Sequence, residues 1–208
     1  MRIFDFDGPV MQAVNWIGNT FLVNLCFIIC CFPVFTIGAS ATALYSVYLL
    51  DKDETWVVTR FFRAFKSNFR QSTKVFLIML CAVVVILLNF YALSAYSIAG
   101  SGFLYFILYI ASFLVLSIGI FSFGLIAKFE NTVKQTVKNA VILTVGMALP
   151  ALMIVFITIL PLVLLMVDAE LFLDTVLLWL LVGFALCTKV NAFIMKQIFR
   201  KLLPKQQI

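Results

Sequence analysis

The side chains best suited to chemistry in this chain lie inside long apolar stretches. Cys26 and Cys30 are four residues apart, so on a helix their thiols share a face and could bind a soft metal. The chain has no histidine, and no methionine stands at a matching spacing, so we expect these thiols to serve packing. The intramembrane Ser and Thr residues have no base nearby, and the acidic residues lie in connections. We therefore expect no catalytic site, no metal and no cofactor, and hence no enzyme.

A second candidate is an interruption in the first apolar stretch, residues 8–50. Proline removes a backbone donor, and small or hydroxyl residues then allow the chain to turn; the positions are Pro33, Thr36, Gly38, Ser40 and Thr42. Ser40 is placed to cap a new helix. A broken helix at membrane depth exposes N–H groups that favour anions, as in transporter sites. Gly38 and Thr42 are also a small-xxx-small pair, so a packing seam is the prediction and a binding site the alternative.

The third candidate is an amphipathic segment, residues 58–72. Its aromatic side chains recur at the spacing of one helix face, and its polar side chains fall mostly elsewhere around the helix. The aromatic residues are Phe61, Phe62, Phe65 and Phe69, and the polar ones include Arg63, Lys66, Asn68 and Arg70. Rings at the acyl boundary with cations at the headgroups are typical of an interfacial helix. The alternative is a docking helix for a cytoplasmic partner, such as a nucleotide-binding subunit of a transporter.

These candidates must be positioned by helices that cross a membrane. Hydrophobic residues make up 64% of the 208 residues and charged residues only 12%, which excludes an ordinary soluble domain. Residues 75–127 contain no charged side chain and would form one helix of roughly 80 Å. A bilayer core is about 30 Å thick, so this stretch must fold as a hairpin. The glycine-containing residues 99–102 are its expected turn.

The predicted fold is all-α: a single integral membrane domain over residues 1–208, a polytopic bundle of five to six transmembrane segments with a cytoplasmic amphipathic helix. The predicted segments are residues 12–35, 39–50, 75–98, 103–127, 139–167 and 171–194, with the interfacial helix at 58–72. The segment at 39–50 is too short to cross unless protein buries its start. Five or six segments, and with them the side of the N-terminus, stay open, although length favours six. The amides expected to hydrogen-bond between helices are Asn15, Asn19, Asn24 and Asn89.

The charges predict an orientation. All but one of the fifteen Lys and Arg residues lie in residues 52–74, 128–138 and 189–205, whereas the connection after residue 167 is acidic. Lys and Arg are retained on the cytoplasmic side, so we expect the basic loops and the C-terminus there. The same patches predict attraction to anionic headgroups of the bilayer, with no nucleic acid as partner. Lys189 is expected to snorkel to the headgroups, and a buried functional lysine is the alternative.

Three segments resemble the YesL-like family of bacterial integral membrane proteins, a domain of unknown function. They are Phe4-Asp5-x-Asp7-Gly8-Pro9, the run from Pro33 to Tyr45, and Phe61-Phe62-x-x-Phe65-x-x-Asn68-Phe69. The resemblance is specific in the first third of the chain. It implies a multi-pass protein of the bacterial plasma membrane and, because such proteins are found near carbohydrate-uptake genes, an accessory role in sugar transport. It supplies no catalytic residue.

Three classes of function remain. The first is an accessory or regulatory component associated with carbohydrate uptake, with transporter subunits as partners. The second is a small neutral-solute transporter or channel. The third is a structural or lipid-organising membrane protein. The near absence of charge within the spans argues against coupled transport of ions, but a passive path for a neutral solute stays open. The resemblance favours the first class, and a homo-oligomer is compatible with each.

Overall fold

The computed structural model describes residues 9–50, 56–96 and 101–202, and the chain within these ranges is helical, without strands. This confirms the predicted all-α architecture. The elements in chain order are α1 (Pro9–Cys31), the 3-10 turn η1 (Val34–Thr36), α2 (Ile37–Leu49), α3 (Val57–Ala95), α4 (Ser101–Lys128), α5 (Val133–Gly146), α6 (Ala148–Val167), α7 (Ala169–Leu178), the π-helical turn η2 (Trp179–Gly183) and α8 (Phe184–Leu202).

Helix α2 lies at the centre of the protein. The helices α1, α3, α4 and α8 all pack against it. Ten of its 13 residues are buried, and most of these are Gly, Ala, Ser or Thr. Small side chains let neighbouring helices approach closely, which explains how one short helix accommodates four others. We call α2, together with the helix surfaces that pack on it, the hub.

Two hydrophobic cores meet at α2. Tyr45 and Leu49 belong to the larger core, which they share with buried residues of α4, α5, α6 and α8. Ala43, Leu44 and Val47 belong to the smaller core, which also contains one residue each from α1, α3 and α8. Because one helix contributes to both cores, displacing α2 would disrupt packing throughout the hub.

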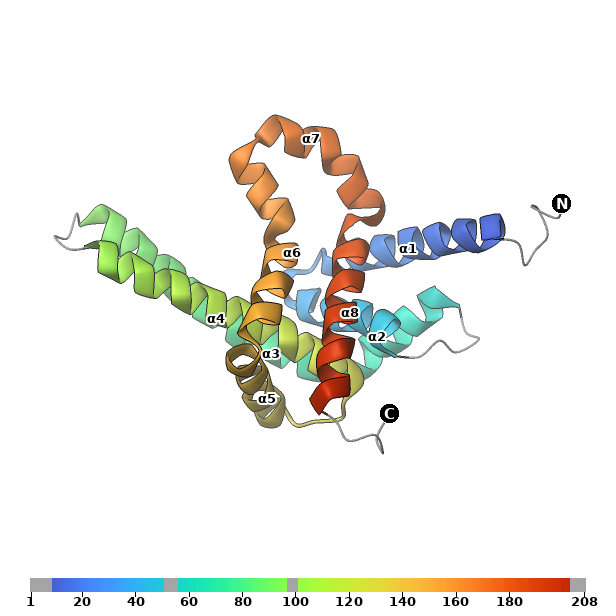
Figure 1. Cartoon of the computed structure of the whole chain (residues 1–208), viewed down its shortest axis with the longest axis horizontal. Helices are drawn as coiled ribbons and strands as arrows, with labels where there is room; N and C mark the ends of the chain where they lie inside the picture. The colour runs from blue at the N-terminus through green and yellow to red at the C-terminus, as the bar shows by residue number, and fades with distance from the viewer. Residues whose placement is uncertain (1–8, 51–55, 97–100, 203–208) are drawn as a thin grey trace.

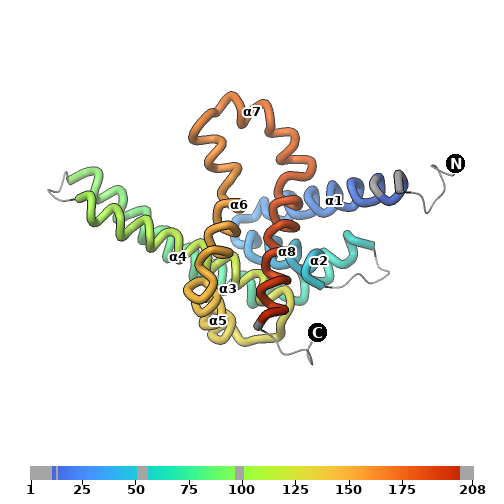
Figure 2. The backbone as a smooth tube through the Cα atoms, viewed as in Figure 1, coloured from blue at the N-terminus to red at the C-terminus, as the bar shows by residue number. Residues whose placement is uncertain are grey.

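Three arms extend from the hub, as Figure 1 shows: the α3–α4 hairpin to the left, α6, α7 and the start of α8 to the top, and α1 to the right. The backbone tube shows α7 arching between α6 and α8 (Figure 2). Aromatic contacts join the two helices of the α3–α4 arm, where the Phe90 ring lies 6.0 Å from Tyr105 and 5.3 Å from Tyr109 between centroids. Many large apolar side chains of the arms are exposed, which fits surfaces that meet lipid tails.

Five helical segments of the described residues are long and apolar enough to cross a bilayer: α1, α3, α4, α6 and the continuous stretch from α7 to α8. At 13 residues, α2 is shorter. Its first turn, including Gly38, Ala39 and Ser40, is buried by protein, as the length of this segment required. The chain thus combines five long segments with one short segment enclosed in the hub.

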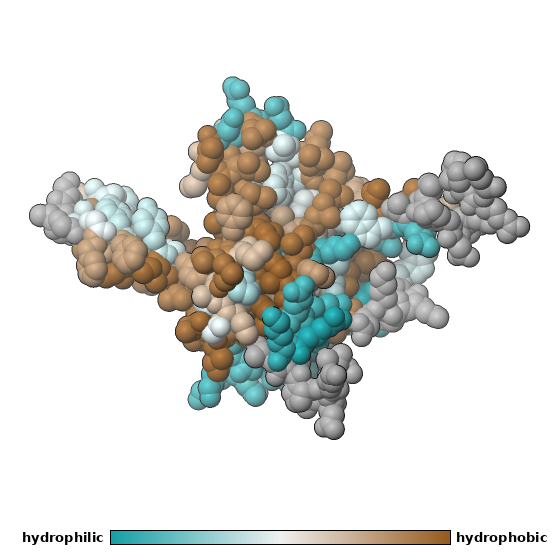
Figure 3. Space-filling model, viewed as in Figure 1, coloured by the Kyte–Doolittle hydropathy of each residue, from teal (hydrophilic) through white to brown (hydrophobic). Residues whose placement is uncertain are grey.

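Polar and apolar residues separate along the upright arm. The space-filling view shows hydrophilic residues at the top, around α7, and again at the lower edge, with a broad hydrophobic surface between them (Figure 3). The upper group contains Asp168, Glu170 and Asp174, and Arg200 and Lys201 lie in the last turn of α8. This distribution matches a protein embedded in a membrane.

Two predicted boundaries differ from the structure. The interfacial helix at 58–72 and the span at 75–98 form one continuous helix, α3, because residues 57–95 contain neither Gly nor Pro to interrupt it. The predicted span at 139–167 is divided at Met147, between α5 and α6. Pro150 therefore falls in the first turn of α6, where a missing N–H removes no helical bond, and Pro161 lies inside the helix.

The first and last segments also differ in detail. Helix α1 ends at Cys31 instead of residue 35, and α8 continues to Leu202 instead of residue 194. Ser40 does not cap the second helix, because α2 already begins at Ile37. The predicted motif at residues 4–8 and the turn residues 99 and 100 lie outside the described residues.

Gly38 stands where α2 comes closest to α3. A Cβ atom added to Gly38 would lie 2.6 Å from the Cβ of Phe76 and 2.7 Å from the carbonyl oxygen of Ser72. Neither atom can swing aside, because the carbonyl belongs to the α3 backbone and a Cβ is fixed to it. Glycine is required here by the close approach of two helices.

We predict that Gly38→Ala lowers the free energy of unfolding by about 1–3 kcal/mol, the usual cost of overpacking. The matched control is Gly119→Ala in α4, where an added Cβ would lie 3.6 Å from the Met79 side chain, an ordinary contact. Thermal unfolding in detergent measures both variants. A Gly38→Ala midpoint equal to that of Gly119→Ala would contradict the close crossing.

Candidate functional site

The Thr36 side chain forms hydrogen bonds within the interruption between α1 and α2. The Thr36 hydroxyl oxygen lies 2.5 Å from the carbonyl oxygen of Cys30 and 2.6 Å from that of Pro33. The last carbonyls of a helix lack intrahelical partners, so this buried hydroxyl offers a donor where α1 ends. Pro33 itself is exposed at the turn. The Thr36 hydroxyl therefore links the end of α1 to the start of α2.

The other hydroxyls of the predicted break turn back onto their own helix. Ser40 donates to the Thr36 carbonyl at 3.0 Å, and Thr42 donates to the Gly38 carbonyl at 2.9 Å. One bond crosses to the next helix, from the Ser72 hydroxyl to the Thr42 hydroxyl at 2.8 Å. The structure thus brings Thr36, Gly38, Ser40 and Thr42 together in α2 and its first cap, and their geometry is that of a packing seam.

The far end of α2 is held by a cation from α3. The Arg60 guanidinium donates to the carbonyl oxygen of Val47 at 3.3 Å, within the last turn of α2, where positive charge is favourable. A small cavity of about 190 Å³ adjoins this contact and is lined in part by Arg63 and Asn68. Asn68 donates to the Ala64 carbonyl of its own helix at 3.1 Å. Arg60 therefore joins α3 to the end of α2, whereas Asn68 bonds within its own helix.

The aromatic face predicted on α3 divides into two parts. Phe61 is fully buried in the smaller core of the hub, so it does not reach a membrane boundary or a partner. Phe62 is 47% exposed, and Phe65 and Phe69 are half-buried. The rings follow one another along the helix, with centroids 6.4 Å apart from Phe61 to Phe65 and 5.5 Å apart from Phe65 to Phe69. The first ring anchors α3 in the hub, and the others continue the row outward.

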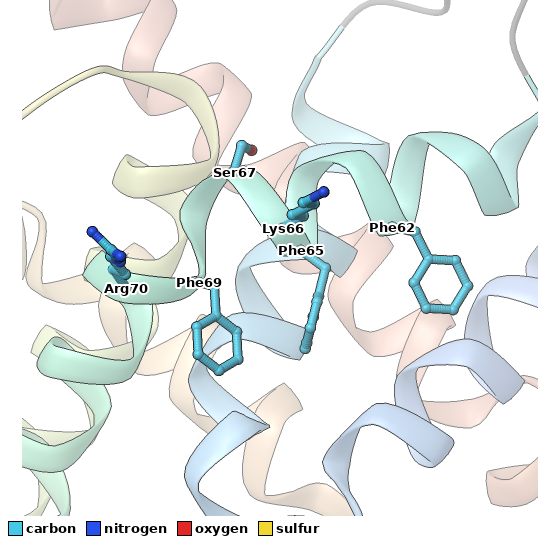
Figure 4. A pocket seen from close by; sticks show the side chains of 6 residues that line it. All are labelled: Phe62, Phe65, Lys66, Ser67, Phe69 and Arg70. Carbon is cyan, nitrogen blue, oxygen red and sulfur yellow. The ribbon is translucent and has the colours of Figure 1, made fainter.

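A surface cavity of about 530 Å³ lies beside the outer rings, and Figure 4 shows the side chains that line it: Phe62, Phe65, Lys66, Ser67, Phe69 and Arg70. In this view the three rings lie below α3, while the amino group of Lys66 and the guanidinium group of Arg70 lie along the helix above them. The Lys66 and Arg70 side chains are exposed. Five of these six residues are among the interfacial or partner-docking candidates of the sequence, and Ser67 is not.

Asn24 joins α1 to the π-helical turn of the last segment. Its Nδ2 atom donates to the carbonyls of Trp179 at 3.1 Å and Leu180 at 2.7 Å, and its Oδ1 accepts from the Ala185 N–H at 2.9 Å. A π-helical turn disrupts the regular backbone ladder, so a fully buried amide here satisfies groups that the helix does not. Asn24 therefore connects α1 to the upright arm through hydrogen bonds.

The other intramembrane amides behave differently. Asn89 donates to the Val85 carbonyl of its own helix at 2.8 Å, and Asn15 and Asn19 are exposed on α1. Asn191, which the sequence reasoning missed, is buried in α8 and donates to the Thr158 hydroxyl at 2.9 Å. Its signal was available, because an amide in an apolar span is expected to seek a partner on another helix.

Lys189 and two of the cysteines take part in packing contacts. The Lys189 ammonium lies 4.2 Å from the centroid of the Trp16 ring, a cation–π contact between α8 and α1. Cys26 and Cys30 pack at the edge of the smaller core. Within the described ranges, no three His, Cys, Asp or Glu side chains are grouped so that they could hold a metal ion.

Comparison with known proteins finds one family model that matches part of the chain. The fold defines an all-α integral membrane protein with five long apolar segments. A family model described as "Protein of unknown function, DUF624" matches residues 20–90, about a third of the chain. The match covers the end of α1, the break, α2 and most of α3, which are the elements that build the hub. Neither the curated proteins nor the solved structures contain a match.

We predict that Asn24→Leu destabilises the protein by about 2 kcal/mol, because the three hydrogen bonds of a buried amide are lost. Asn19→Leu, at an exposed position of the same helix, should change the stability by less than about 0.5 kcal/mol. Thermal midpoints in one detergent allow the comparison. Equal midpoints for the two variants would show that Asn24 does not fix α1 to the last segment.

Proposed function

We propose that this membrane protein is an accessory or regulatory component of a transport assembly in the plasma membrane of a bacterium. Carbohydrate uptake is the proposed context, and it rests on the resemblance to the YesL-like family. The partners are transporter subunits. The protein is proposed to be neither an enzyme nor the path of the transported solute.

This proposal rests on the contrast between the hydrogen-bonded hydroxyls of the hub and the exposed apolar side chains of the arms. A solute path needs polar groups that face an opening, but the hydroxyls of Ser40, Thr42 and Ser46 in α2 each donate to a carbonyl of their own helix or its cap. The same engagement argues against a nucleophile at these positions. The α3–α4 arm, in contrast, projects from the hub and exposes apolar side chains on both helices, such as Leu88 and Phe106.

An arm of this kind suits contact with another protein inside the bilayer. Membrane helices associate through van der Waals packing over apolar surfaces, without a hydrophobic driving force between them. A two-helix hairpin anchored at one end offers such a surface on both of its helices. The central helix of the hub, on the other hand, is already enclosed by this chain. The arm is therefore the proposed contact for a transporter subunit.

The proposed orientation places the basic connections and the C-terminus in the cytoplasm. Lys128 ends α4, Lys134 and Lys138 lie in α5, and Arg200 and Lys201 lie in the last turn of α8. The acidic residues around α7 lie at the opposite end of the upright arm (Figure 3). Retention of Lys and Arg on the cytoplasmic side supports this orientation.

A photo-reactive amino acid at Leu88 or Phe106, introduced in the native host, tests the contact. We expect an adduct that mass spectrometry identifies as a permease or a nucleotide-binding subunit of a transporter. The matched position is Leu177 on α7, which is exposed to a similar degree but lies on another arm, and there we expect lipid adducts. Adducts with lipid alone at Leu88 and Phe106 would refute the accessory role at this arm.

A further inference from the structure

We propose that residues 62–70 of α3 bind the headgroup and upper acyl region of one anionic phospholipid. The site is the cavity of about 530 Å³ shown in Figure 4. Lys66 and Arg70 bind the phosphate, and Phe62, Phe65 and Phe69 contact the glycerol ester region and the first methylenes. This inference does not depend on the accessory role, which concerns the other end of α3.

The arrangement of the lining residues matches the two chemistries of a phospholipid. On a helix, residues four apart lie on one face, so Lys66 and Arg70 form a short row of cations. The row of rings runs beside it, at a spacing of three and four residues. Figure 4 shows the rings below the helix and the cationic groups along it. A phosphate thus meets two cations while the adjoining chain meets aromatic carbon.

The helices around the site carry no acidic side chain, although Glu130, in the connection after α4, adjoins Asn131, whose carbonyl accepts a hydrogen bond from Gln71 of α3. Helices α1, α2, α4 and α5, which pack against α3, contain no Asp or Glu, and α3 contains none itself. The positive potential of Lys66 and Arg70 is therefore not cancelled by acidic groups of these helices. Cations at a membrane surface attract anionic lipids with about 1 kcal/mol each.

Ser67 adds a polar contact at the rim of the cavity. Its hydroxyl donates to the Ala64 carbonyl at 3.1 Å, and the side chain is exposed. The oxygen retains acceptor capacity toward a donor from the headgroup. A headgroup with hydroxyls, such as that of phosphatidylglycerol, offers both an anionic phosphate and such a donor. We therefore choose phosphatidylglycerol as the probe.

The test measures binding of phosphatidylglycerol to the full-length protein in detergent, by native mass spectrometry and by the shift in thermal midpoint. The double variant Lys66→Gln/Arg70→Gln should reduce the apparent affinity by about thirtyfold, which corresponds to two cations at about 1 kcal/mol each. Both side chains are exposed, so the fold should persist. The matched control is Lys134→Gln/Lys138→Gln in α5, with the same change of charge at two exposed positions.

Further measurements distinguish a specific phospholipid site from binding by charge alone and from a site for free phosphate. Phosphatidylcholine with the same acyl chains should give no shift, and inorganic phosphate at millimolar concentration should not displace the lipid. An equal loss of affinity in the α5 control would show that lipid binding depends only on the net charge of the protein, and it would refute the proposed site. Competition by inorganic phosphate would identify a free-anion site instead. Phe62→Ala should weaken the binding of phosphatidylglycerol, and an unchanged affinity would refute the role of the rings.

Discussion

The enclosure of one short helix is the constraint on which the rest of this structure depends. Four helices approach α2 closely, and they can do so because its residues are small and because Gly38 has no Cβ to collide with α3. The polar groups that such a helix brings into the membrane are satisfied locally, by back-bonds along α2 and by the Arg60 contact at its end. A larger residue at the crossing would separate α2 from α3 and expose these groups.

The hub then determines where functional surfaces can form. Because α2 is enclosed at the centre, the surfaces available for contact are those of the arms and the outer side of α3. The long uninterrupted helix α3 serves both, since its first half carries the aromatic and basic residues and its second half pairs with α4. Asn24 fixes α1 against the π-helical turn, so the upright arm is anchored to the same centre. Partner contact and lipid contact are thus proposed for different parts of one rigid helix.

The fold class is predictable from the sequence, and the candidate residues stand out in it, because their signals are local. The charge-free hairpin, the interruption after Pro33 and the phenylalanine spacing each follow from neighbours along the chain. Other features depend on tertiary contact. Phe61 and Phe62 are adjacent and chemically identical, and their burial differs because the smaller core covers one of them. The position of Asn191 in an apolar span is a local signal, but its partner Thr158 on another helix is not visible in the sequence.

The central claim, that α2 is enclosed by protein and lines no aqueous path, can be measured by cysteine accessibility. Single cysteines at Ser40 and Thr42, in a background without the five native cysteines, would be exposed in proteoliposomes to a small hydrophilic thiol reagent. Cysteine at the exposed position Ser67 serves as the reactive reference. The account predicts labelling at Ser67 and none at the two α2 positions. Rapid labelling of the α2 positions would show water at the centre of the hub and would contradict the account in favour of a solute path.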